Sequence, residues 1–154
     1  MSQSLSKIWV HIIFSTKHRK AFLKDPDIRN KLHHYLFSLC HQQNSPALIV
    51  GGVEDHVHLL IHLHKSQSLS SVIEKIKKYS SKWIKNLVPS DENLREFYWQ
   101  NGYGAFSVSQ SNIENVKFYI ENQESHHRKI SFEDEMRKIF VLYGVDYDER
   151  YVWG

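Results

Sequence analysis

The chain has 154 residues, a length that fits one compact domain with a single core. Hydrophobic residues make up 41% of the sequence and charged residues 24%, so we expect a folded chain that buries a core. The net charge of +3 is a mild excess that is compatible with an anionic partner without requiring one. There is no repeat and no low-complexity linker, so we treat residues 1–154 as one unit.

The cysteine content and the apolar runs indicate where such a protein works. Cys40 is the only cysteine, so the chain can form neither an internal disulfide nor a thiolate zinc site. The apolar run within MSQSLSKIWVHIIF is far shorter than the roughly 20 residues that a membrane-spanning helix needs. No small-residue cleavage site follows it. We expect a cytoplasmic protein without a membrane segment.

A strand and a helix are the first predicted elements. Lys7–Thr16 (KIWVHIIFST) is rich in β-branched and aromatic residues, which is typical of a buried strand. From Pro26, which is acceptable in the first turn of a helix, apolar residues recur at helical spacing until Asn44, Ser45 and Pro46. Between the two elements lie basic residues that either contact passing DNA or only face solvent: Lys17, Arg19 and Lys20.

A hairpin and a second helix follow. The extended runs Ala47–Val53 (ALIVGGV) and His56–His64 (HVHLLIHLH) have only Glu54 and Asp55 between them, so we expect them to pair antiparallel. Ser70 is a candidate N-cap for a helix with one apolar face, formed by Ile73, Ile76, Tyr79, Trp83 and Leu87. Another face of this helix is either a track for phosphates or an ordinary solvated surface, and it carries Lys75, Lys78, Lys82 and Lys85.

The remaining elements complete a fold class. The loop around Pro89, Ser90 and Asp91 is the softest boundary, and Gly102 and Gly104 predict a tight turn before a short strand at Ala105–Val108. Two further helices are predicted. The first is capped by Asn112, and its inward residues are Ile113, Val116 and Ile120. The second is capped by Ser131, and its inward residues are Phe132, Met136, Ile139 and Phe140. The order βαββαβ followed by helices predicts an α+β, ferredoxin-like split βαβ sandwich: an antiparallel four-stranded sheet with helices on one face plus extra C-terminal helices.

The C-terminal segment VDYDERYVWG does not have the composition of a disordered tail. Its aromatic residues are available for burial: Tyr147, Tyr151 and Trp153. We expect the segment to pack on the domain or on a partner subunit.

Two histidines of the third strand are candidate metal ligands. Side chains two residues apart in a strand point to the same face, so His56 and His58 project together while Val57 and Leu59 point into the core. Imidazole suits a divalent ion, and a pair on a stiff strand needs only one or two more ligands. A His-X-His pair alone also fits surface histidines. Asp55 either orients one imidazole or only forms the turn.

The third predicted helix adds a candidate nucleophile. In NIENVKFYIENQESHH, a stripe at three- and four-residue spacing runs beside the apolar face and contains Asn112, Val116, Tyr119, Gln123 and His126. A phenol with a pKa near 10 is protonated at neutral pH, so Tyr119 would attack only a metal-polarised phosphate. The amide oxygen of Gln123, one turn on, could ligate the same ion. Without the histidines, a half-buried tyrosine that reaches water would be the simpler interpretation.

Three segments together resemble the single-tyrosine HUH transposases of insertion sequences that move as single strands, among them the REP-associated tyrosine transposases. They are EDHVHLLIHL, YWQNGYGAFSVS and VKFYIENQ, and the match spans nearly the whole chain in order and spacing. The resemblance implies a DNA transposase that cuts and rejoins single-stranded DNA at hairpin-marked element ends. It implies that His56, His58 and Gln123 hold Mg²⁺ or Mn²⁺ and that Tyr119 forms a 5′-phosphotyrosine link. It also implies a homodimer, in which the tyrosine helix often completes the partner's site.

Two other functions remain open. A ferredoxin-like sheet can bind single-stranded nucleic acid without catalysis by stacking bases on aromatic side chains, for which Trp9, Tyr98 and Trp99 are available. That function leaves the histidine pair unexplained. A histidine-rich metal-binding protein gives Tyr119 and Gln123 no role, and would use a chelating strip of His56, His58, His62 and His64.

Overall fold

Four strands form one antiparallel sheet in the order β2-β3-β1-β4, in a computed structural model that describes residues 1–154. The strands are β1 (Trp9–Ser15), β2 (Ala47–Gly52), β3 (His56–His62) and β4 (Gly104–Val108). β1 and β3 lie side by side in the centre, paired from Trp9↔His62 to Ser15↔His56. With α1 (Pro26–Gln42) and α2 (Leu69–Leu87) as the two crossovers, this order confirms the predicted ferredoxin-like α+β fold.

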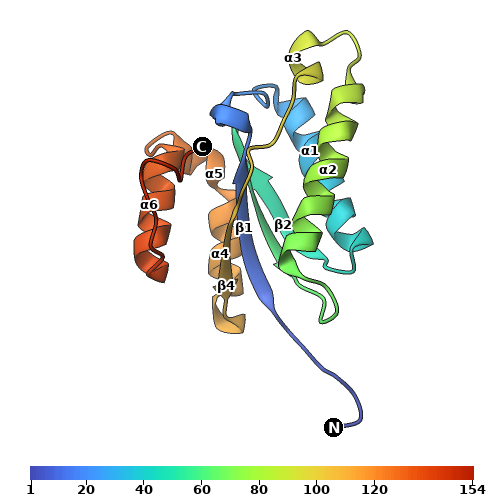
Figure 1. Ribbon diagram of the computed structural model, residues 1–154, viewed down its shortest axis with the longest axis vertical. Helices are drawn as coiled ribbons and strands as arrows, with labels where there is room; N and C mark the ends of the chain where they lie inside the picture. The colour runs from blue at the N-terminus through green and yellow to red at the C-terminus, as the bar shows by residue number, and fades with distance from the viewer.

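Side-chain alternation divides the sheet into two faces. Val10, Ile12 and Phe14 of β1, together with alternate residues of β3, form the main core with α1 and α2. Figure 1 shows α1 and α2 on one side of the sheet and α4 (Ile113–Glu121) and α6 (Phe132–Tyr143) on the other. The predicted C-terminal helices therefore cover the second face, where Ile113 and Ile120 of α4 and Met136 and Phe140 of α6 are buried against strand residues.

Of the three predicted N-caps, which are Ser70, Asn112 and Ser131, only Ser131 makes the expected backbone bond. Asp25 caps α1 by accepting from the Asp27 N–H, and Ser131 caps α6 by accepting from the Asp134 N–H. The predicted cap of α2 was wrong. Ser68, not Ser70, accepts from the Ser71 N–H, because the helix already begins at Leu69 and Ser70 lies inside its first turn.

The inward face of α2 is also rotated from the predicted one. Tyr79, predicted to point inward, is 44% exposed, and the buried residues of the helix are Val72, Ile73, Ile76, Ser80 and Ile84. Ser80 is buried because its hydroxyl accepts the indole N–H of Trp99 at 2.9 Å. The helix therefore packs around a polar contact that apolar spacing does not show.

The third predicted helix is two helices in the structure. α4 ends at Glu121, and α5 (Gln123–His127) begins after Asn122, whose backbone leaves the helical region at φ −103° and ψ 21°. The Asn122 side chain donates to the Phe118 carbonyl at 2.7 Å, which satisfies one terminal acceptor. Asn112 stands at the predicted N-cap position, but its side chain accepts from Asn115 and not from a backbone N–H.

Three short elements were not predicted, namely η1 (Lys17–Arg19), α3 (Glu92–Arg95) and η2 (Gln110–Asn112). The C-terminal segment packs on α6, with the ring of Tyr147 4.7 Å from that of Phe140 and the ring of Trp153 6.4 Å from that of Phe132. This confirms that the tail packs on the domain. None of the helices is both long enough and apolar enough to cross a membrane.

Candidate functional site

The two histidines of β3 lie beneath the C-terminal helices. His56 and His58 are fully buried, and they point to the face that α4 and α6 cover, as the alternation along the strand predicts. Val57 and Leu59 point into the main core, which confirms the predicted division of the strand. His62, at the end of β3, lies beside Trp9 with the two rings tilted by 44° and takes no part in the arrangement below.

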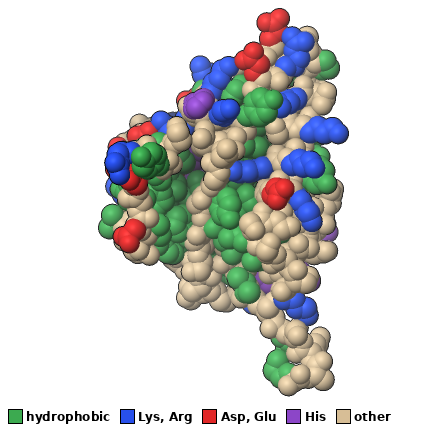
Figure 2. Space-filling view, in the orientation of Figure 1, with side chains coloured by type: hydrophobic (Ala, Val, Ile, Leu, Met, Phe, Trp, Pro, Cys, Tyr) green, Lys and Arg blue, Asp and Glu red, His purple; other side chains and the backbone are tan.

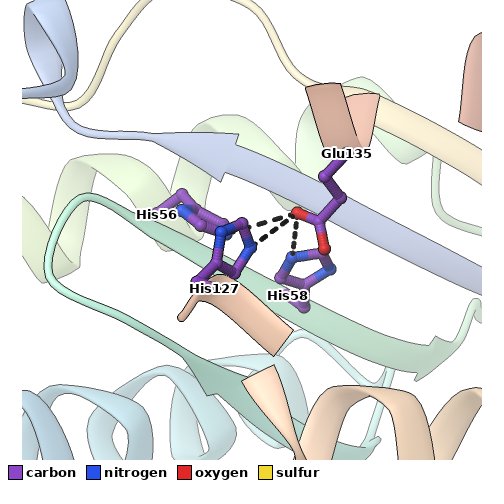
Figure 3. Close-up of side chains that lie close together, drawn as sticks. All are labelled: His56, His58, His127 and Glu135. Carbon is purple, nitrogen blue, oxygen red and sulfur yellow. Dashed lines mark hydrogen bonds and ion pairs between the residues drawn. The ribbon is translucent and has the colours of Figure 1, made fainter. Parts of the chain in front are cut away.

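His127 of α5 and Glu135 of α6 complete a cluster with the histidine pair. Glu135 Oε1 lies 3.0 Å from His127 Nε2, 3.2 Å from His58 Nε2 and 3.4 Å from His56 Nε2. One donor atom from each of the four residues lies within 4.8 Å of all the others. Figure 3 shows the three imidazoles converging on one carboxylate. We refer to these four residues as the histidine–glutamate cluster.

Hydrogen bonds from Nδ1 orient two of the three imidazoles in the cluster. His56 Nδ1 donates to Asp55 Oδ1 at 2.7 Å, and His127 Nδ1 donates to the Ile130 carbonyl at 2.9 Å. When such a ring is neutral, its lone pair is on Nε2, the atom that faces the cluster. Buried His56 Nε2 has no hydrogen-bond partner, so the donor set fits a divalent cation. Asp55 thus both forms the turn and orients an imidazole.

Electrostatics keep the carboxylate of the cluster charged. Burial alone would raise the pKa of Glu135, but the neighbouring imidazoles of His127, His56 and His58 outweigh burial and hold that pKa well below its usual range. Burial lowers the pKa of His58 to about 4, so this ring is neutral at pH 7. Burial also lowers the pKa of His56, but the neighbouring carboxylates of Asp55 and Glu135 outweigh burial and hold that pKa above its ordinary value. A cation that binds here must therefore displace the proton of His56.

Tyr119 of α4 lies against the same cluster. Its hydroxyl donates to Glu135 Oε2 and lies 3.4 Å from His126 Nε2, and its ring is 5.8 Å from that of His58. Burial and the charge of Glu135 raise the pKa of Tyr119 above its usual value, so the phenol is protonated at neutral pH. The structure thus brings the candidate nucleophile to the histidine pair of its own chain.

Gln123 touches the cluster through Glu135. Its Nε2 donates to Glu135 Oε2 at 3.2 Å, while its buried Oε1 has no hydrogen-bond partner. An amide oxygen left unpaired beside a set of imidazoles is an available metal donor. Gln123 therefore stays a candidate ligand.

Two members of the cluster were missed by the sequence analysis. His127 follows His126, which lies on the predicted stripe, but nothing in the spacing distinguishes it. Glu135 had a signal: at three- and four-residue spacing it shares a stripe with Phe132 and Ile139, so an acid stands on the apolar side of that helix. A charged residue at such a position needs a partner.

The predicted basic residues do not reach the cluster. Lys75, Lys78 and Lys82 are exposed on α2, which covers the opposite face of the sheet, and Figure 2 shows Lys and Arg side chains along this side of the molecule. Lys85 lies over the ring of Tyr98, 3.6 Å from its centroid. Lys17 also lies near that ring, and Lys20 pairs with Glu96.

Arg19 is the predicted basic residue nearest to the cluster. It pairs with Glu133 at 2.5 Å and lines a pocket of about 540 Å³ that Asp55 and His127 also line. This pocket is open to solvent beside two residues that belong to the cluster or orient it, so it is a route by which a substrate can approach.

The aromatic residues considered for base stacking differ in exposure. Trp99 is buried and bonded to Ser80, so it cannot stack on a base, and Trp9 is partly buried. Tyr98 is 54% exposed. Only one of the three therefore offers a largely open ring.

Comparison with known proteins places these residues in a family. The family described as "Transposase IS200 like" matches residues 4–123, a range that contains His56, His58, Tyr119 and Gln123 but ends before His127. No curated protein matches the chain.

Solved structures share the fold. One is of a candidate transposase from Deinococcus radiodurans R1, with 23% sequence identity and a TM-score of 0.62, covering 78% of this chain and 93% of that one. Another is of a REP-associated tyrosine transposase bound to a REP hairpin, with 15% identity and a TM-score of 0.58, covering 84% of this chain and 76% of that one. These agree with the family match, which covers well over half of the sequence, and the chain belongs to the IS200-like transposase family.

Proposed function

We propose that this transposase cuts and rejoins single-stranded DNA at hairpin-marked ends, with Tyr119 as the nucleophile. The observation that carries the proposal is that the Tyr119 hydroxyl and three imidazole Nε2 atoms meet at one carboxylate, that of Glu135. A nucleophile and a set of metal donors that share one residue can act on the same phosphate. The solved REP-associated relative is bound to a hairpin, which supports the choice of substrate.

The histidine–glutamate cluster is the proposed metal site. His56, His58, His127 and Glu135 would hold Mn²⁺ or Mg²⁺, with Gln123 as a further candidate donor. A bound divalent ion would polarise the scissile phosphate and so compensate for the weak nucleophilicity of a phenol.

The chain's own residues handle the bonds and the proton. The Tyr119 oxygen forms a bond to phosphorus while the bond from phosphorus to the 3′-oxygen breaks, which leaves a 5′-phosphotyrosine and a free 3′ end. Because Tyr119 is protonated, its proton must leave as the new bond forms. Burial lowers the pKa of His126, so this ring is neutral, and its Nε2 lies 3.4 Å from the hydroxyl, where it can take the proton. The released 3′-oxygen takes a proton from water.

The covalent link explains how one site can both cut and join. The tyrosyl ester conserves the broken phosphodiester, so a 3′-hydroxyl can reverse the step and reseal a strand without ATP. Hydrolysis would lose that bond. Strand transfer therefore needs the tyrosine as well as the ion.

A covalent-adduct assay tests the nucleophile. Labelled single-stranded hairpin DNA is incubated with the protein and Mn²⁺, and protein–DNA adducts that resist denaturation are separated on a gel. Wild type and the control variant Tyr79→Phe, an exposed tyrosine on α2, should form the adduct. Tyr119→Phe and wild type with a chelator should not. An adduct with Tyr119→Phe would move the nucleophile to another of the eight tyrosines, and a blank with every hairpin would favour the binding-module function.

We further propose that residues 1–154 act as one domain in the cytoplasm and that the protein is a homodimer.

A mixing experiment tests whether each active site of the dimer combines residues of both subunits. Tyr119→Phe and His58→Ala are each inactive in the proposal, and their mixture regains adduct formation only if Tyr119 serves the histidines of the other subunit. Tyr119 already lies within 5.8 Å of His58 in its own chain, ring to ring, so we expect no recovery.

A further inference from the structure

Another buried histidine lies behind the cluster, on β1. His11 stands opposite Leu60 in the sheet, so it is the diagonal neighbour of His58 on the same face. Its Nε2 lies 2.8 Å from His58 Nδ1, with the ring centroids 5.1 Å apart, and both residues are buried. His11 is not one of the four clustered donors, because its Nε2 is occupied by His58.

The bond between the two rings constrains where their protons lie. His58 faces the cluster with Nε2, which is 3.2 Å from Glu135 Oε1. An imidazole that binds a cation through Nε2 must carry its proton on Nδ1, and the partner of His58 Nδ1 is His11 Nε2. His11 must then accept this bond and carry its own proton on Nδ1.

We propose that His11 is a positioning residue that holds His58 in its metal-binding tautomer and ring orientation. The inference rests on the metal site of the proposed function. It adds a residue that touches neither the ion nor the DNA, and that acts only through His58.

His11 differs chemically from the groups that accept hydrogen bonds from the other two imidazoles of the cluster. Asp55 and the Ile130 carbonyl can only accept a hydrogen bond, so the rings they hold stay in one tautomer. His11 can also donate. Without an ion, His11 can donate from Nε2 to His58 Nδ1 while His58 donates from Nε2 to Glu135, and both rings are neutral.

Loading the site then requires a proton rearrangement within this pair. The proton on His11 Nε2 passes along the hydrogen bond to His58 Nδ1, the proton on His58 Nε2 leaves to solvent as the cation binds, and His11 takes a proton from solvent on Nδ1. The pair carries two protons before and after, so no charge is created in the buried site. His58 is the ring of the cluster whose support can permit this exchange.

Metal affinity tests the proposal without reference to DNA. Mn²⁺ is titrated into the full chain, and the free ion is measured by electron paramagnetic resonance. His11→Phe keeps a ring of similar size but has no acceptor, and should raise the Mn²⁺ Kd roughly 10- to 100-fold, the usual effect of losing a supporting bond to a metal histidine. His11→Gln, whose amide oxygen can accept from His58, should restore most of the affinity. His62→Phe, on the same face at the end of β3, is the matched control and should leave the Kd unchanged.

Several results would overturn the proposal. They are an unchanged Kd in His11→Phe, an equal loss in His11→Gln while circular dichroism shows both variants folded, or no Mn²⁺ binding by wild type. If His11→Phe does not fold, long-range ¹H–¹⁵N spectra of the Zn²⁺-loaded wild type decide. They should place a proton on Nδ1 of both His11 and His58, and a proton on His11 Nε2 contradicts the proposal.

The outcome is separable from that of the proposed function. If Mn²⁺ binding depends on His11 but the protein forms no DNA adduct, the proposed function is contradicted and the role of His11 is supported. If wild type forms the adduct normally but His11→Phe has an unchanged Mn²⁺ Kd, the proposed function is supported and the role of His11 is contradicted.

Discussion

Gly51 controls how closely the helix that carries Tyr119 approaches the sheet. It lies on β2 opposite His58, and a Cβ added there would lie 2.6 Å from the Ile120 carbonyl oxygen and 2.9 Å from Ile120 Cγ2. Ordinary contacts begin near 3.4 Å. Because the closest atom belongs to the backbone, a rotamer change cannot relieve it, and Gly51→Ala must push α4 outward by roughly 0.8 Å.

The displacement has two expected costs. Overpacking of this kind lowers the free energy of unfolding by about 1–3 kcal/mol, which leaves a protein of ordinary stability folded. Tyr119 directly precedes Ile120, so it moves with the helix, and a misplacement near 1 Å can slow a reaction about 100-fold. Urea unfolding and the single-turnover rate of adduct formation measure these two effects.

A control and two results judge the reasoning. Gly104→Ala adds a Cβ that meets only side-chain atoms of Phe106 and Met136, which can adjust, so its effects should be smaller. Wild-type stability and rate in Gly51→Ala would refute the close-approach argument. A loss of stability with an unchanged rate would show that α4 shifts without carrying Tyr119 out of position.

Three further predictions follow from the cluster and the lysines. Glu135→Gln should raise the Mn²⁺ Kd at least about tenfold, because losing even a hydrogen-bond partner of a metal ligand has an effect of this size. Glu133→Gln on the same helix is the control and should leave the Kd unchanged. Equal Mn²⁺ affinities of the two variants would exclude Glu135 as a ligand. In chelator, the pKa of His58 is about 4 in the folded chain against 6.5 in the unfolded one, so only the unfolded chain binds this proton between those values. The free energy of unfolding should therefore fall from pH 6.5 to pH 4, by up to roughly 3 kcal/mol for this group, and His58→Gln should flatten the urea-derived pH profile. If the four α2 lysines contact phosphates, replacing all of them with alanine should weaken hairpin binding and reduce its salt dependence. An unchanged salt dependence would show that they form only a solvated face; the lysines are Lys75, Lys78, Lys82 and Lys85.

The predicted helices and strands agree with the structure where neighbouring residues in the sequence determine them. Runs of β-branched and other apolar residues placed the first three strands, and Ser131 caps α6 with its expected backbone bond. The predictions failed at Ser70 and Tyr79. There, the start and rotation of α2 depend on Ser68 and on a hydrogen bond from Trp99, which is distant in the sequence.

The candidate site divides in the same way. His56 and His58 could be assigned from the sequence because a strand sends alternate side chains to one face whatever surrounds it. Helical spacing made Tyr119 and Gln123 candidates, and the family resemblance gave them their roles. His127 and Glu135 join the pair only because the helix breaks at Asn122 and α6 folds back over the second face of the sheet.

The sequence by itself therefore determined the ferredoxin-like order of elements, the family and the face on which the histidines lie. These depend on period, composition and motif, which are properties of neighbouring residues. Only the tertiary structure decided which groups meet the histidines: Glu135, His127 and, behind them, His11. A charge or an imidazole in the sequence has no assigned partner until packing brings a second element within hydrogen-bond distance, because partners across a sheet or between helices have no fixed spacing along the chain.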